Sequence, residues 1–351
     1  MGATIAVQPG RHVIDLLRRG DLLAARDFAA AHYPISLPDL DCAVSVIVSA
    51  TWLRLHGPNE MIRAEAHRVV HAVSKMAAKW VAQTPPRPLP AEKIPHDKAA
   101  FDSLMIELIG HGGFYHPIEV PSVEGYVEPS RKNARARDDL YHPSEWQLVE
   151  GLLTRHLGGI DGRFIVDAGT AEGFFSRMLA RRGAEVLAVD QTIMMAVRTA
   201  VLSALNGLQD RITTNIGNVA ALATGLGAMR RADTLGRVDA ICALGLIYHF
   251  HDLEDELTGL LCEDVPLVFE FTAADPGDEA GYDPSRHRDG TPISLPWLVD
   301  WLARRGYVAL HEPRWAEYVA RRSTSGMRQE MLMALPRAQW CVAPTAALVR
   351  G

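Results

Sequence analysis

From about residue 162 onward, short apolar runs alternate with segments whose apolar residues recur at helical spacing. Short apolar runs bounded by turn residues indicate buried strands, and their alternation with helices indicates a parallel sheet covered on both faces. We therefore predict a doubly wound, mostly parallel α/β sheet, with the last two strands forming an antiparallel edge. The expected strands are 163–168, 185–189, 212–217, 238–244, 266–271, 307–311 and 331–335, and the expected helices are 174–182, 194–205 and 296–305.

The preceding part of the chain follows a different pattern. Apolar residues at helical spacing predict helices near the N-terminus, and residues 84–90, which contain four prolines, read as a stiff linker. Apolar runs on either side of Pro121 and Gly125 predict a hairpin, and 141–157 reads as a helix. The expected organisation is a helical N-terminal domain at 1–110, a hairpin and connecting segment at 111–139, and a Rossmann-like core at 140–340.

Composition narrows the possible functions. The 351 residues include 36 Lys and Arg against 42 Asp and Glu, a net charge of −6, which does not favour a broad nucleic-acid surface. The N-terminus lacks a secretory signal pattern, and the longest apolar stretch near it is too short to span a bilayer. The four cysteines form no CxxC pair, and the histidines just before the core, His111, His116 and His142, show no HxxxH or HxH spacing. We expect a cytoplasmic protein with no metal and no membrane contact.

One segment carries most of the chemical information. A predicted strand ends at Asp167, a glycine-rich turn follows, and a helix begins near Gly173. Gly169 and Gly173 allow a sharp turn and a close backbone approach to a ligand. The next strand ends at Asp190, where a carboxylate can accept hydrogen bonds from both ribose hydroxyls of a nucleoside. The pyrophosphate fingerprint GxGxxG is absent, so another nucleotide, or no ligand, remains an alternative.

Residues 164–179 resemble motif I of class I S-adenosylmethionine-dependent methyltransferases, and Asp190 resembles the ribose-binding acidic residue of that family. The resemblance implies S-adenosyl-L-methionine as the cofactor. Asn218, after the third strand, corresponds to an adenine contact, or else is an ordinary loop cap. The implied cofactor-binding residues are Asp167, Gly169, Thr170, Glu172, Gly173, Asp190, Gln191, Asn218 and Leu244.

Candidate acceptor-site residues follow from the position of the strand ends. Ligands of doubly wound sheets bind at the carboxyl ends of the strands, which points to 244–251 and to Glu270. His249 is a candidate general base, or else lines the pocket, and Glu270 is a candidate base or substrate-orienting group, or else a structural carboxylate. The candidate substrate contacts, with packing as the alternative, are Tyr141, Trp146 and Tyr248.

A narrower resemblance covers about residues 131–337. Segment 244–249, Glu270, Arg131–Lys132 and Glu145–Trp146 are similar to the bacterial tRNA wobble-uridine carboxymethyltransferases. That similarity implies a carboxylated cofactor, with Lys132 holding the extra carboxylate. The four basic residues of 131–137 are either a solvated loop or an anion-binding patch.

These patterns favour methyl transfer to O, N or C of a small-molecule acceptor, in specialised metabolism. A tRNA-modifying methyl- or carboxymethyltransferase is the alternative enzyme, and a catalytically inactive cofactor-binding scaffold or partner protein is the alternative of another class. The N-terminal helices could form a homodimer surface, a substrate lid or an RNA contact.

Overall fold

The structure is a computed structural model. It describes residues 141–231, 237–261, 265–277, 281–312, 314–315 and 328–340, together with 64, 68–69, 78, 81–82, 86–88, 116, 118–119 and 126–127.

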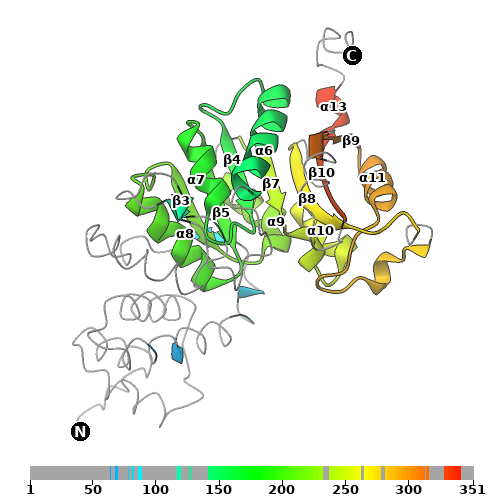
Figure 1. Cartoon of the computed structure of the whole chain (residues 1–351), viewed down its shortest axis with the longest axis horizontal. Helices are drawn as coiled ribbons and strands as arrows, with labels where there is room; N and C mark the ends of the chain where they lie inside the picture. The colour runs from blue at the N-terminus through cyan, green and yellow to red at the C-terminus, as the bar shows by residue number, and fades with distance from the viewer. Residues whose placement is uncertain are drawn as a thin grey trace. The chain divides into compact units, whose positions relative to one another are not determined.

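An eight-stranded sheet organises the described residues (Figure 1). Its order is β1-β6-β5-β4-β7-β8-β10-β9. The strands are β1 (Arg87–Pro88), β4 (Phe164–Ala168), β5 (Glu185–Asp190), β6 (Ile212–Ile216), β7 (Ala240–Leu244), β8 (Leu267–Ala273), β9 (Tyr307–His311) and β10 (Arg328–Pro336). β4 pairs in parallel with both β5 and β7, and β7 with β8, whereas β10 is antiparallel to β8 and β9. The predicted doubly wound, mostly parallel sheet with an antiparallel edge is confirmed.

The strand order reverses at β4. The chain moves from β4 outward to β5 and β6, then returns to the other side of β4 with β7. In open α/β sheets this reversal opens a crevice at the carboxyl ends of the central strands, where ligands bind. Residues 169–173 and 244–249 both follow strands at this reversal.

The helices of the core are α6 (Tyr141–Leu157), α7 (Phe174–Arg181), α8 (Ile193–Leu205), α9 (Leu222–Arg231), α10 (Leu253–Leu260) and α11 (Leu295–Arg304). Short 3-10 turns lie at Val219–Ala221 and Ile247–His249. α10 begins where the Asp252 side chain accepts a hydrogen bond from the Asp255 N–H, which satisfies one free donor of the helix. Its buried face, Leu253, Leu257 and Leu260, has helical spacing.

The core lies against β7 and β8, whose residues are all buried. Strands covered on both faces need near-continuous apolar sequence, which these two have. Glu270 is the charged exception within β8.

Residues 84–90, predicted to be a linker, contain a short strand instead. Arg87 and Pro88 pair antiparallel with Ile216 and Asn215 at the edge of the sheet. An edge strand tolerates proline because one row of its backbone groups has no strand partner. The predicted hairpin is present, as β2 (Ile118–Glu119) and β3 (Tyr126–Val127) pair antiparallel.

Contacts divide the chain into two units. The first comprises residues 1–133, 170–174 and 190–218, and among its described elements are β1, β2, β3, α8 and β6. The second comprises 134–169, 175–189 and 219–351, with α6, β4, α7 and everything from α9 onward. The domain limits expected from the sequence remain a prediction. No helix in the described part of the chain combines the length and apolar character needed to cross a membrane.

Candidate functional site

The loop after β4 turns on two glycines, at each of which a side chain would be strained. Gly169 has φ +76° and Gly173 has φ +71°, both in the left-handed region. A Cβ on Gly169 would lie 2.8 Å from Leu246 Cδ1, and one on Gly173 would lie 2.6 Å from Thr199 Cγ2. The loop therefore presents bare backbone at both positions.

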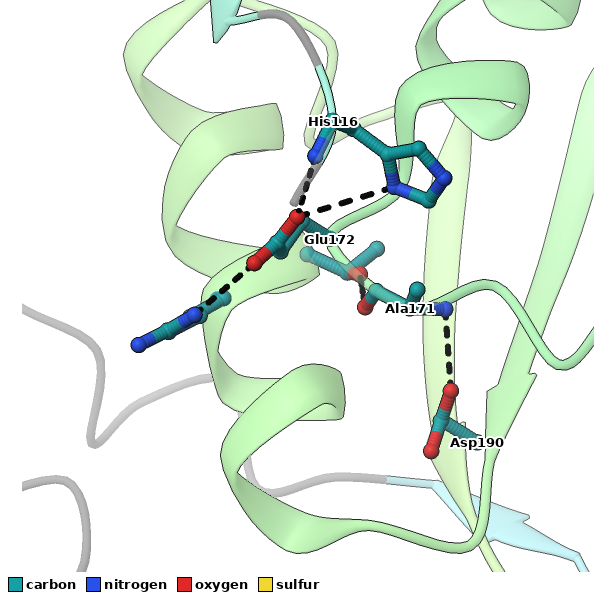
Figure 2. Close-up of polar contacts among 6 residues, drawn as sticks. His116, Ala171, Glu172 and Asp190 are labelled. Atoms are coloured by element: carbon teal, nitrogen blue, oxygen red, sulfur yellow. Dashed lines mark hydrogen bonds and ion pairs between the residues drawn. The ribbon is translucent and has the colours of Figure 1, made fainter. Parts of the chain in front are cut away.

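The carboxylate of Asp190, at the end of β5, is held by two backbone donors, of which Figure 2 shows the Ala171 N–H. Its Oδ2 accepts from the Ala171 N–H at 2.9 Å, and its Oδ1 accepts from the Thr192 N–H at 2.7 Å. Ala171 is the one described non-glycine residue with positive φ, and its carbonyl accepts from the Thr199 hydroxyl. An ionised carboxylate offers about four sites that accept hydrogen bonds.

Glu172 is fully buried and bound by protein groups on both oxygens. Oε1 accepts from Arg198 Nη1 at 2.8 Å, and Oε2 accepts from the His116 N–H at 2.8 Å, with His116 Nδ1 3.6 Å away (Figure 2). Glu172 thus fastens residue 116 and α8 to the glycine loop. The sequence predicts Glu172 as a cofactor-binding residue, but it does not predict Arg198 or His116 at that site.

Other residues expected at the cofactor also have protein partners. The Ser176 hydroxyl donates to Asp167 Oδ2 at 2.5 Å, linking the end of β4 to α7, and Asn218 Nδ2 donates to the Ala82 carbonyl at 3.0 Å. Thr170 is buried and Gln191 is exposed. Leu244, at the last position of β7, is 8% exposed.

A second group of polar residues gathers at the carboxyl ends of β7 and β8. Leu244 is in register with Glu270, and the Gly245 N–H donates to the Glu270 carbonyl at 3.1 Å. A Cβ on Gly245, whose φ is +62°, would lie 3.5 Å from Glu270 Oε2 and 3.9 Å from the Tyr248 hydroxyl. The Glu270 side chain and the Tyr248 hydroxyl therefore face the same side of Gly245.

The negative charge of Glu270 repels that of Glu145, which lies near the start of α6. Both are buried, with Glu145 3% and Glu270 4% exposed. Burial raises the pKa of Glu270 to about 7. Burial and the negative charge of Glu270 raise the pKa of Glu145 well above its ordinary value. Glu145 was not predicted as a site carboxylate, although its spacing to Leu148 and Leu152 places it on the apolar stripe of its helix.

His249 lies beside an aspartate that sequence reasoning missed. His249 Nδ1 is 2.6 Å from Asp289 Oδ1, with about half of each side chain exposed. The Gly290 N–H donates to the Tyr248 carbonyl at 2.8 Å, which ties the loop carrying Asp289 to the 3-10 turn Ile247–His249. No motif marks the Asp289 loop, because its relation to His249 arises only in the fold.

Of the other residues predicted to contact the substrate, the structure describes the side chain of Trp146 but not those of Tyr141 and Lys132. Trp146, on α6, is 2% exposed, and its Nε1 has no hydrogen-bond partner among the described residues. The Tyr141 side chain, Lys132 and the basic segment 131–137 lie outside the described residues. Within the part of the chain that the structure describes, no group of three or more His, Cys, Asp or Glu side chains could hold a metal ion.

No protein-family model matches the sequence, and no curated protein matches it significantly. Among solved structures, magnesium protoporphyrin IX methyltransferase from Synechocystis, with bound SAH, is 18% identical, covers 56% of this chain and 84% of its own, and has a TM-score of 0.42. Burkholderia thailandensis 1,6-didemethyltoxoflavin-N1-methyltransferase is also 18% identical, with coverage of 56% and 84% and a TM-score of 0.38. Geranyl diphosphate C-methyltransferase from Streptomyces coelicolor is 17% identical, with coverage of 57% and 80% and a TM-score of 0.40. At these scores the similarities add no residue to the site.

Proposed function

We propose that this chain is an S-adenosylmethionine-dependent methyltransferase that acts on a small-molecule acceptor. The observation that carries the proposal is the Asp190 carboxylate, held at the end of β5 by the N–H groups of Ala171 and Thr192. A carboxylate fixed in this way can accept hydrogen bonds from two ribose hydroxyls at once. The adjacent loop, with glycines at 169 and 173, allows a nucleoside to approach the backbone closely.

The charges of the loop favour a nucleoside without phosphate. Residues 167–173 contain Asp167 and Glu172 but no lysine or arginine, and Asp190 adds a third carboxylate. Arg198 neutralises Glu172, and the remaining carboxylates, Asp167 and Asp190, favour a positively charged sulfonium nucleoside over a pyrophosphate. The resemblance of residues 164–179 to motif I of the methyltransferases supports the same cofactor, which would supply an activated methyl group.

The acceptor would bind at the carboxyl ends of β7 and β8. β4, β7 and β8 are consecutive parallel neighbours in the sheet, so their ends meet at one edge. Tyr248 and Glu270 would orient the acceptor, and methyl transfer then needs mainly proximity and alignment. His249 could accept a proton on Nε2, since its Nδ1 faces Asp289. We place this reaction in the cytoplasm and in specialised metabolism.

Calorimetric titration with S-adenosylhomocysteine (SAH) tests the proposal. Asp190→Asn removes the charge but keeps an oxygen acceptor, and we expect its affinity for SAH to fall by roughly 1–3 kcal/mol. Asp210→Asn, which changes an exposed aspartate in the turn before β6, is the matched control and should bind like the unmodified chain. Unchanged affinity in a folded Asp190→Asn variant would reject the ribose role, and no binding to the unmodified chain would reject the proposed function.

A further inference from the structure

Two buried carboxyl groups of the second unit have no basic partner in the part of the chain that the structure describes. Glu145 and Glu270 are both more than nine-tenths buried, and among the described residues no lysine, arginine or histidine pairs with either. Glu270 Oε1 is fully enclosed and has no hydrogen-bond partner. Buried carboxyl oxygens in folded proteins are nearly always hydrogen-bonded or paired, so Oε1 of Glu270 lacks a proton donor here.

Glu270 lies beside Gly245, which directly follows the carboxyl end of β7. Glu270 Oε2 and the Tyr248 hydroxyl both lie within 4 Å of the point where a Cβ on Gly245 would be. Glycine at this position leaves the side of residue 245 that faces the two oxygens without side-chain atoms. A donor placed there would meet a carboxylate oxygen and a phenolic oxygen together.

The charge of the pair indicates what kind of donor fits. Two carboxyl groups that repel each other without a counter-ion retain a proton near neutral pH, which leaves about one negative charge on the pair. A single positive charge would neutralise it, whereas an anionic acceptor would add to the repulsion. A calcium or magnesium ion would require about six oxygen ligands, and no group of three His, Cys, Asp or Glu side chains suited to any metal exists within the described ranges.

We propose that Glu270 binds the protonated nitrogen of a basic amine acceptor beside Gly245 and accepts its proton, and that the negative charge shared with Glu145 favours the cation. The N–H bond breaks and an O–H bond forms on Glu270, which frees the nitrogen lone pair. The lone pair then forms the new N–C bond with the transferred methyl carbon, while the electron pair of the broken C–S bond stays on sulfur. This inference rests on the proposed function and narrows its acceptor to basic nitrogen compounds.

Binding of two probe molecules of matched shape tests the inference on the full chain. Benzylamine offers a cation and an aromatic ring for Tyr248, and benzyl alcohol offers the same ring without charge. At pH 8 we expect the unmodified chain to bind benzylamine about tenfold more tightly than benzyl alcohol, because the bond to the cation is charge-assisted. Equal affinities, or no detectable binding of benzylamine, would overturn the inference.

Three variants test which carboxyl groups cause the preference for benzylamine. Glu270→Gln and Glu145→Gln should each abolish the preference for benzylamine, and they test the pair independently if one of them fails to fold. Glu185→Gln, at the exposed start of β5, should keep the preference. A preference retained in both buried variants would place the amine elsewhere and overturn the assignment.

Titration of the same preparations with SAH separates this inference from the proposed function. SAH binding without an amine preference rejects the amine site and leaves the methyltransferase standing. An amine preference without SAH binding keeps the amine site and rejects the methyltransferase, together with the proton transfer assigned to Glu270.

Discussion

Glu270→Gln should change the stability of the protein in a way that depends on pH. Glu270 lies within the sheet, opposite Leu244 on one neighbouring strand and Met331 on the other, so its side chain cannot move out to solvent without disturbing β8. Burial raises its pKa from an ordinary value of 4.5 to about 7. Glutamine has nearly the same shape but no ionisable proton, so the substitution isolates the titration.

The free energy of unfolding changes with pH because the folded and unfolded chains bind the Glu270 proton with different pKa values. Below pH 4.5 the carboxyl group is protonated in both states and makes no pH-dependent contribution. Between pH 4.5 and about 7 the unfolded chain releases the proton while the folded chain keeps it, so the free energy of unfolding falls as the pH rises. Above that range the loss is complete, and at about 1.4 kcal/mol per pKa unit it amounts to roughly 3 kcal/mol.

Urea denaturation at pH 5 and pH 8 measures this effect. The free energy of unfolding of Glu270→Gln, relative to the unmodified chain, should increase by roughly 2–3 kcal/mol between the two pH values. Comparing the two pH values removes any constant difference between a buried amide and a buried acid. Glu185→Gln should show no such increase, and a difference for Glu270→Gln that does not vary with pH would refute the unpaired, buried state of Glu270.

Two further predictions concern the glycine loop. Gly169→Ala and Gly207→Ala both place a side chain at positive φ, but only Gly169→Ala brings a Cβ to 2.8 Å from Leu246. We therefore expect only Gly169→Ala to weaken SAH binding, by about tenfold or more. Equal SAH affinity of these two variants by calorimetry would contradict the close approach of the cofactor at Gly169. Glu172→Gln should lower the free energy of unfolding by roughly 1–3 kcal/mol and speed hydrogen exchange at the His116 amide, since a neutral side chain replaces a charged acceptor. Unchanged exchange at His116 would show that Glu172 does not hold that segment.

The parallel part of the sheet could be predicted because its strands are buried on both faces. Burial of every residue in β7 requires a continuous apolar run, which is visible in the sequence itself. α9 was missed because two glycines within Leu222–Arg231 weaken its helical signal. β1 was missed because its proline-rich sequence forms a strand only by pairing with β6, a contact that no local pattern reveals.

The same distinction between local and distant contacts applies to the candidate site. Gly169, Gly173 and Asp190 belong to one strand–turn–helix–strand unit, so their spacing alone predicted a nucleoside site. The pairing of His116 with Glu172 joins residues 56 positions apart, and that of His249 with Asp289 joins residues 40 positions apart. Neither pair has a spacing that the chain fixes locally, so neither could be predicted.

We propose that the loop at 167–173 and Asp190 bind a sulfonium nucleoside rather than a phosphate-bearing dinucleotide. Parallel calorimetric titrations of the full chain with SAH and with NAD test this binding most directly. We expect one SAH bound per chain with micromolar affinity and no detectable binding of NAD. Binding of NAD, or absence of SAH binding by a folded protein, would contradict it.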